Sequence, residues 1–156
     1  MKWRHSFQIA TCALTASVLL TACGSKLNIV PADAIQEMKE QIAFTDQFET
    51  LDREGACRVY GVDEELVDDS AALAGSGATA ESLSVWKAVD AKSAEQVEEE
   101  LQVFVDGYIE GYSDYKPEEV PKLESAIMSR EGQYVILCIS ADNAAAETVV
   151  DQVLHP

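Results

Sequence analysis

The stretch Tyr134-Val135-Ile136-Leu137-Cys138-Ile139-Ser140 is the most informative for the fold. From Tyr134 to Ile139, the odd-numbered and the even-numbered positions are both apolar. Successive side chains of a strand point to opposite faces of a sheet. An apolar run of this kind therefore predicts a central strand that is covered on both sides. Ala126-Ile127-Met128-Ser129 precedes it, and Glu131-Gly132 lies between them. This arrangement predicts a hairpin.

Further strands are predicted upstream of this hairpin. Residues Glu81 to Val89 alternate, with Leu83, Val85, Lys87 and Val89 on one face and Ser82, Ser84, Trp86 and Ala88 on the other. The glycine-rich segment 74–78 predicts a turn before this strand. The acidic segment from Val62 to Asp69 is expected to turn as a brief helix; the alternative is that Leu66 to Leu73 leads into a strand. Residues 57–60 are predicted as a short strand that ends at Gly61.

Helices are predicted where apolar residues recur every three or four positions. The first is expected over Pro31–Glu54, since Ile35, Met38, Ile42, Thr45, Phe48 and Leu51 share one helical face. The second is expected from an N-cap at Ser93 to about Tyr115. A short helical connector is predicted over Pro117–Glu124, and a last helix after Asp142 or Asn143.

The predicted order of elements is α-β-β(-β)-α-β-β-α in a single domain, residues 31–156. Strands joined by tight turns favour the α+β class. The sequence thus predicts a mostly antiparallel sheet of four to five strands, with about three helices packed over one face.

The N-terminus has the layout of a secretory signal. A cationic start, Met1-Lys2-Trp3-Arg4-His5, precedes an apolar run from Phe7 to Leu20 that is too short to span a bilayer comfortably. Leu20-Thr21-Ala22-Cys23 then reads as a lipobox. We therefore expect residues 1–22 to be a lipoprotein signal peptide, Cys23 to be acylated, and residues 23–30 to be a lipidated tether. The predicted location is the extracytoplasmic face of the cell membrane, with the lipid at Cys23 as the membrane contact.

The composition is strongly acidic, with 28 Asp and Glu against 11 Lys and Arg and a net charge of −17. Loss of Lys2 and Arg4 with the signal would make the processed chain more acidic still. This charge excludes nucleic acid as an expected partner and favours solubility or attraction of cations and basic proteins. A protein partner in the cell envelope is therefore one expectation.

Two cysteines, Cys57 and Cys138, would remain besides Cys23 in a compartment that permits disulfides. A bridge between them would close a loop of about 80 residues and contribute roughly 4–5 kcal/mol in the chain-entropy model. The alternative is a pair of buried free thiols. Neither cysteine has a C-x-x-C partner, so no metal site is predicted here.

No catalytic residue is predicted. Ser84-Val85-Trp86-Lys87 matches S-x-x-K, but this motif needs a helix, and the segment alternates like a strand. The only histidine after the signal, His155, lies one residue from the C-terminus, which argues against a triad. We therefore expect a protein without enzymatic activity and without a cofactor.

Two features are candidates for a binding surface. The densest acidic cluster is formed by Asp63, Glu64, Glu65, Asp68 and Asp69; it lacks the spacing of a calcium loop, and a solvated turn is the alternative. Trp86 lies on the serine face of its strand and would anchor a partner if exposed, the alternative being a place under a helix. Tyr108, Tyr112 and Tyr115 have helical spacing beside Phe104, which is typical of a core stripe.

Several short motifs resemble those of a family of small lipoproteins from Gram-positive anaerobes, whose shared domain has no known function. Besides the lipobox, they are Tyr60-Gly61-Val62-Asp63, Ala80-Glu81, Tyr115-Lys116-Pro117, and Gly132-Gln133-Tyr134-Val135 leading to Ser140-Ala141-Asp142. Their order and spacing carry the resemblance over most of the processed chain. It implies no catalytic residue.

The function expected from these observations is non-enzymatic binding or scaffolding at the cell envelope by a membrane-anchored lipoprotein. A small-ligand or cation-binding accessory lipoprotein is the first alternative, and a carboxylate-based hydrolase is the second.

Overall fold

A computed structural model describes residues 27–156. The predicted signal peptide (1–22) and the predicted lipidation site Cys23 lie outside the described residues. The five strands form one antiparallel sheet in the order β1-β2-β3-β5-β4. The strands are β1 (Phe48–Leu51), β2 (Val67–Gly75), β3 (Ser82–Ala88), β4 (Ile127–Glu131) and β5 (Tyr134–Ile139). The helices are α1 (Pro31–Gln41), α2 (Arg53–Tyr60), α3 (Ala91–Tyr115), α4 (Val120–Glu124) and α5 (Asn143–Leu154), with 3₁₀ turns η1 (Glu64–Leu66) and η2 (Pro117–Glu119).

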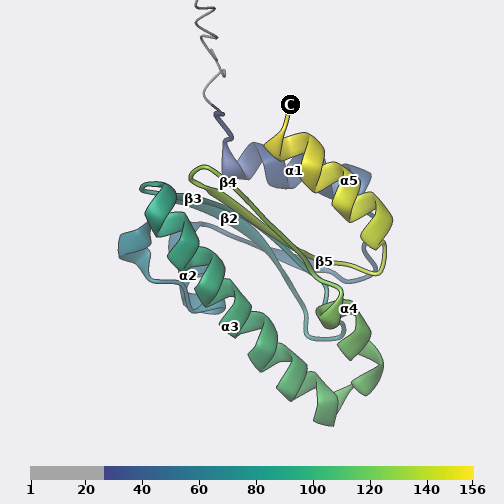
Figure 1. The fold of residues 1–156 in the computed structure, drawn as a ribbon. Coiled ribbons are helices and arrows are strands. Elements are labelled where there is room, and N and C mark those ends of the chain that lie inside the picture. Colours follow the sequence, from purple (N-terminus) through teal and green to yellow (C-terminus); the bar gives the residue numbers. More distant parts are fainter. Residues whose placement is uncertain (1–26) are drawn as a thin grey trace, which may run out of the picture.

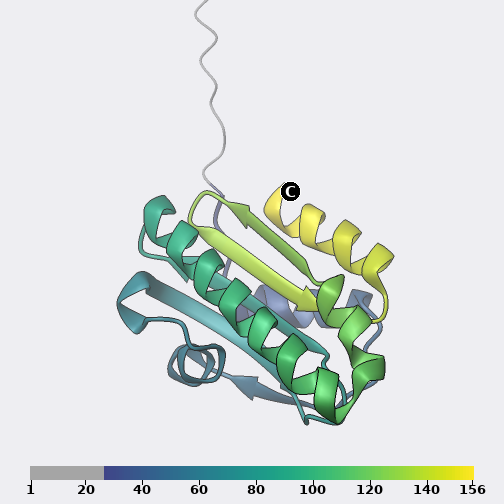
Figure 2. The same ribbon diagram turned by 60° about the horizontal axis from the view of Figure 1, so that its bottom comes forward.

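The sheet is the middle of three layers (Figures 1 and 2). Helices α1 and α5 cover one face, whereas α2, α3 and α4 cover the other. The antiparallel α+β fold is therefore as predicted. The prediction of helices over one face is wrong, and the described part of the chain, residues 27–156, forms five α-helices in place of about three.

Strand β5 explains why both faces are covered. Val135, Leu137 and Ile139 pack beneath α3, whereas Ile136 and Cys138 pack beneath α1 and α5. All six residues of β5 are buried. The prediction of a central, doubly covered strand is confirmed, as is the hairpin that joins β5 to β4.

The predicted first helix is too long. Helix α1 ends at Gln41, Ile42 is extended, and Phe48 begins strand β1, which pairs with β2. The apolar spacing past Ile42 is misleading, because Phe48 and Leu51 pack on opposite faces of the sheet. Tertiary pairing with β2 thus overrides the helical pattern.

The predicted strand over residues 57–60 is also wrong, because these residues are the last turns of helix α2. The carboxylate of Asp52 caps this helix by accepting from the N–H of Gly55 at 2.9 Å. Gly61 ends it in a left-handed conformation with φ of 71°, which glycine adopts without steric cost. Gly61 therefore ends the element as predicted, although the element is a helix.

Helices α3 and α5 begin close to their predicted starts. The N-cap of α3 is Asp90, which accepts from the N–H of Ser93, so Ser93 lies inside the helix and is not its cap. Asp142 caps α5, one of the two predicted residues. Within residues 27–156, no helix combines the length and the apolar character needed to cross a bilayer.

Residues 27–30, which the sequence assigns to the tether, pack against the domain. Ile29 is buried, its N–H donates to the hydroxyl of Tyr134 at 3.2 Å, and Leu27 packs against the same cluster. The folded unit thus begins before Pro31.

Cys57 and Cys138 are buried free thiols, the second of the two alternatives, and the possible disulfide between them is not formed. Cys57 packs with α2 on one face of the sheet, whereas Cys138 packs on the other face. The sheet itself separates them, and a bridge requires close Cβ atoms. Burial raises the pKa of both thiols, that of Cys138 to about 12.

Candidate functional site

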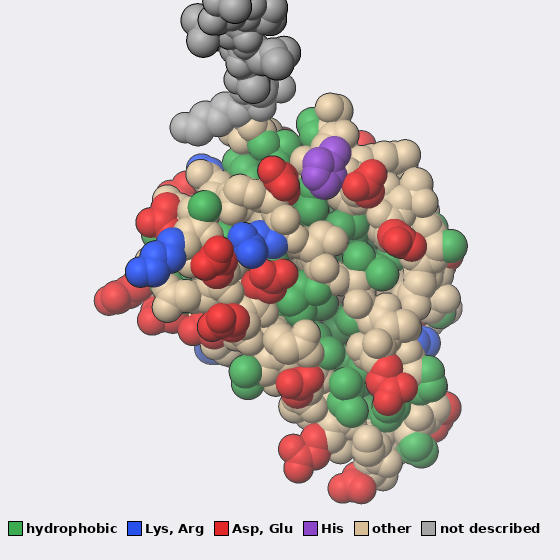
Figure 3. All heavy atoms as spheres, in the orientation of Figure 1, with side chains coloured by type: hydrophobic (Ala, Val, Ile, Leu, Met, Phe, Trp, Pro, Cys, Tyr) green, Lys and Arg blue, Asp and Glu red, His purple; other side chains and the backbone are tan. Residues whose placement is uncertain are grey.

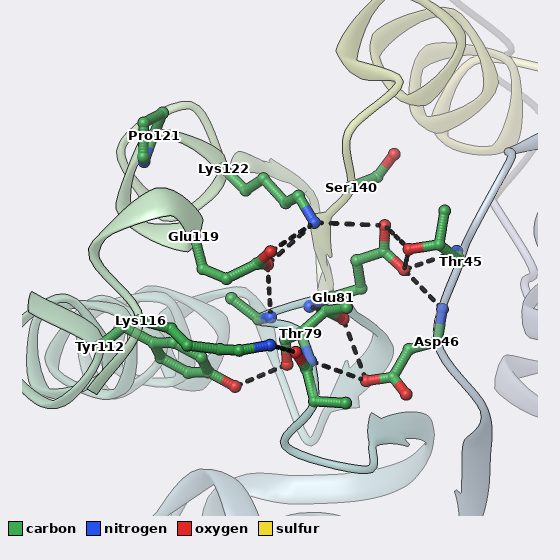
Figure 4. Close-up of polar contacts among 12 residues, drawn as sticks. Thr45, Asp46, Thr79, Glu81, Tyr112, Lys116, Glu119, Pro121, Lys122 and Ser140 are labelled. Carbon is green, nitrogen blue, oxygen red and sulfur yellow. Dashed lines mark hydrogen bonds and ion pairs between the residues drawn. The ribbon is translucent and has the colours of Figure 1, made fainter.

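The loop between β2 and β3 is held by three carboxylates that come from different parts of the chain (Figure 4). Asp46, in the loop between α1 and β1, accepts from the backbone N–H and the hydroxyl of Ser76 at 3.1 and 2.6 Å. It also accepts from the hydroxyl of Thr79 at 3.0 Å. Gly75 lies so close to Asp46 that a Cβ there would be 2.8 Å from its carboxylate.

Glu81 is the most buried of these carboxylates, with 1% of its surface exposed. One oxygen, Oε2, accepts from the backbone N–H groups of Thr45 and Asp46 at 2.7 and 2.9 Å. The hydroxyl of Thr45 donates to both carboxylate oxygens at 3.1 Å. Glu81 thereby satisfies the backbone just where the predicted long helix has ended.

Glu119 joins the same loop from the segment after α3. Its Oε2 accepts from the N–H of Ala80 at 2.9 Å and from Nζ of Lys122 at 2.8 Å. Lys122 also lies 3.7 Å from Oε1 of Glu81, so one ammonium group bridges two buried carboxylates. Figure 4 shows Lys122 between Glu119 and Glu81.

We call Asp46, Glu81, Glu119 and Lys122 the carboxylate clamp. Each carboxylate accepts several hydrogen bonds. Glu81 and Glu119 are buried and Asp46 is half-buried, and buried charges are stable only when they are paired and hydrogen-bonded. The clamp therefore ties three segments of the chain together. Composition did not single out these residues, although the motifs Ala80-Glu81 and Tyr115-Lys116-Pro117 mark two of the segments.

A row of aromatic rings leads from the core to the surface along α3. Tyr60 contacts Trp86 and Phe104 with ring centroids 5.6 and 4.5 Å apart. Phe104 in turn contacts Tyr108 at 4.1 Å. The row continues through Tyr112 to Tyr115, which is 69% exposed. The stripe expected to be core is thus only partly buried: Phe104 is half-buried and Tyr112 is buried, whereas Tyr108 and Tyr115 are exposed.

Trp86 is not on the surface, so its prediction as a binding anchor is wrong. Its side chain is completely buried under the helices of one face, and its indole N–H donates to the hydroxyl of Ser84 at 2.9 Å. This is the alternative place under a helix. Tyr112, by contrast, binds the loop between β2 and β3: burial raises its pKa to about 12, and its hydroxyl donates to the carbonyl oxygen of Thr79 at 2.6 Å.

An apolar groove of about 420 Å³ lies beside this aromatic row, between residues 58–61 at the end of α2 and the α3 flank from Glu100 to Tyr108. We call it the α2–α3 groove. Val59, Val103 and Tyr108 lie in it with exposed fractions of 42%, 71% and 37%. Large apolar side chains at this exposure, gathered in one hollow, are typical of an interaction site.

The predicted acidic cluster does not form one cation site. Glu64 pairs with Arg53, and Asp68 pairs with Lys87. Asp63 lies instead at the end of the α2–α3 groove, where its N–H donates to the carboxylate of Glu100 at 2.9 Å. Across residues 27–156, no three Asp, Glu, His or Cys side chains gather as metal ligands would.

The chain belongs to the family described as Domain of unknown function (DUF4358), whose sequence model matches residues 40–140. This match confirms the predicted resemblance to a family whose shared domain has no known function. The search of the curated proteins finds no match, and the search of the solved structures also finds none. The matched segment contains the whole sheet with α2, α3 and α4, and therefore both the carboxylate clamp and the α2–α3 groove.

Replacing Lys122 by methionine is expected to destabilise the fold strongly. The substitution keeps the apolar stem but leaves Glu81 and Glu119 without their shared cation. Removing one partner of a buried ion pair costs about 3–5 kcal/mol. Chemical denaturation should show this loss of free energy of unfolding, whereas Lys39→Met, at an exposed position on α1, should change it by less than about 0.5 kcal/mol. Equal effects of the two substitutions would contradict a bridging role for Lys122.

The clamp also predicts loss of stability in acid. Burial alone would raise the pKa of Asp46 and Glu119, but hydrogen bonds from Ser76 and Thr79, and from Lys122 and Ala80, outweigh it and hold both below their ordinary values of 3.8 and 4.5. The unfolded chain therefore binds protons at these groups before the folded chain does, and their contribution is lost as the pH falls below about 4.5.

Denaturant titrations from pH 6 to pH 3 measure this effect. We expect the free energy of unfolding of Glu119→Gln to fall less steeply with decreasing pH than that of the unmodified chain. Parallel curves for the two proteins would show that Glu119 has the same pKa in the folded and unfolded states.

Proposed function

We propose that this chain is a lipoprotein anchored through Cys23 to the extracytoplasmic face of the cell membrane, where its domain binds an envelope protein without catalysing a reaction. The single observation that carries the binding role is the α2–α3 groove, an open apolar hollow on an otherwise acidic domain. Acidic side chains are spread over the face shown in Figure 3, and Lys and Arg are few there.

The place where the chain enters the domain supports this arrangement. Leu27 lies three residues beyond Gly24, so the span from Cys23 to Leu27 reaches at most about 14 Å. A domain so tethered sits close to the membrane at its α1 end. The groove belongs to the opposite layer of the sheet, formed by α2 and α3 (Figure 1). This position leaves the groove open to a partner.

The two alternatives have less support. A cation-binding role would draw on the acidic cluster, but Glu64 and Asp68 pair with basic side chains. A carboxylate-based hydrolase would need two carboxylates facing a cleft, whereas Glu81 and Glu119 are buried and engaged by Thr45, Ala80 and Lys122.

The lipid anchor is tested by Cys23→Ala. We expect this variant to incorporate no labelled palmitate and to leave the membrane fraction, because the thiol that would carry the lipid is missing. Cys12→Ala is the matched control, since Cys12 lies inside the predicted signal and should leave labelling and fractionation unchanged. Equal membrane retention and labelling of both variants would contradict the anchor.

The binding role is tested by a photo-reactive amino acid in place of Val103, in intact cells. We expect adducts with a protein of the envelope, because Val103 is 71% exposed in the groove. The same probe in place of Lys39, on the layer across the sheet, is the control and should give no such adduct. Indistinguishable patterns at the two positions would contradict binding through the groove.

A further inference from the structure

One flank of the α2–α3 groove has no side chain where a side chain would fit. Gly107 lines the groove and Gly111 lies one turn further along α3, and a Cβ at either position would meet no atom within 4 Å. Glycine inside a helix costs about 1 kcal/mol relative to alanine. Packing within this chain thus leaves both glycines unexplained. Because Gly107 has no side chain, the groove is deeper between Val103 and Tyr108.

An apolar groove beside a row of aromatic rings is suited to binding a helix. Small residues let the backbone of another helix approach closely, and an apolar groove accepts the apolar face of an amphipathic helix. The groove runs along the axis of α3 from Glu100 to Tyr108, and the open positions continue to Gly111. A helix laid along α3 would cover Val59, Val103 and Tyr108 together.

The charges around the groove select the occupant. Helix α3 has seven acidic residues and one lysine, Lys92. Two of the acids, Glu95 and Glu98, pair with Arg130 of β4. The other five are Glu99, Glu100, Asp106, Glu110 and Asp114. Glu100 lines the groove, and the acidic turn from Asp63 to Glu65 adjoins it through the hydrogen bond between Asp63 and Glu100. The one basic residue of the lining, Arg58, is paired with Glu54 at 3.4 Å. The rim is therefore complementary to basic side chains.

We propose that the α2–α3 groove binds a basic amphipathic helix of an envelope protein, with its apolar face on Val103, Gly107 and Tyr108 and its Lys or Arg side chains toward the acids of α3. This inference rests on the proposed binding function and adds the chemistry of the partner. A second copy of the chain is a poorer occupant, because a self-complementary contact would place the acidic flanks of two α3 helices against each other.

The experiment uses the full-length chain purified in detergent and two synthetic helices, one built of leucine and lysine and one of leucine and glutamate in the same pattern. Calorimetric titration is expected to give saturable binding of the lysine peptide, weakened by salt, and no binding of the glutamate peptide. Gly107→Leu should weaken the lysine peptide at least about tenfold, because the leucine fills the groove without changing the charge.

Gln102→Leu is the matched control, since Gln102 is exposed on α3 outside the groove and its side chain donates to the carboxylate of Asp106 on the same helix. We expect it to bind the lysine peptide within about twofold of the unmodified chain. Gly107→Leu should not impair folding, because leucine is a better helix former than glycine and its Cβ meets open space. A Tm at or above that of the unmodified chain checks this.

Three results would overturn the proposal. Lysine-peptide binding that Gly107→Leu leaves unchanged would be charge attraction outside the groove. Equal binding of the glutamate peptide would remove the electrostatic selection. A dimer of the free chain that Gly107→Leu abolishes would assign the groove to a second copy. The basic helix and the proposed function can fail separately. Adducts at Val103 with a segment of an envelope protein that is not basic would refute the basic helix and still support envelope binding.

Discussion

Strand β5 is buried on both faces, and this constraint sets the three-layer arrangement of the domain. A strand with apolar residues at every position has no face that can be left to water, so the sheet needs a helical layer on each side. Helices α1 and α5 supply one layer and α2, α3 and α4 the other. Strand β3, next to β5, has the same requirement, because Leu83 and Val85 face one layer and Trp86 faces the other.

The carboxylate clamp solves the problem that this layering creates at one end of the sheet. The chain must cross from α1 to the edge strand β1, and the loop between β2 and β3 must meet both that crossing and the end of α3. Backbone N–H groups left free at such a junction are costly unless they are hydrogen-bonded. Glu81 accepts from Thr45 and Asp46, and Glu119 accepts from Ala80. Lys122 then pairs with both carboxylates, so acidic residues serve here as structural parts of the interior.

The surface of the domain has two parts, an acidic exterior and the apolar α2–α3 groove. The acids that are not in the clamp cover the exterior and oppose association with nucleic acid or anionic surfaces, whereas the α2–α3 groove exposes apolar side chains within that acidic surround. Because the family match covers residues 40–140, the groove and the clamp belong to the part of the chain that defines the family. The proposed role follows from this combination: an apolar floor supplies affinity, and the acidic rim selects the charge of the partner.

Local sequence pattern was enough to predict an antiparallel sheet that contains strand β3, the doubly covered strand β5, its hairpin with β4, and the long helix α3, because alternation and apolar periodicity report local geometry directly. Prediction from the sequence failed where a residue far along the chain determines the local structure. The helical spacing of Thr45, Phe48 and Leu51 gave way to pairing with β2, and residues 57–60 formed a helix capped by Asp52.

Which polar and aromatic residues form the site depends on how the elements pack in three dimensions. Trp86 is buried because α3 crosses its face of the sheet, and Cys57 and Cys138 stay apart because the sheet lies between them. In a chain with 28 acidic residues, no pattern distinguishes Glu81 and Glu119 from their solvated neighbours. Likewise, the exposure of Val103 beside Gly107 depends on how α2 packs against α3. The physical reason is common to all of these: periodicity records which face of an element is apolar, whereas burial, pairing and grooves arise from what the rest of the chain places against that face.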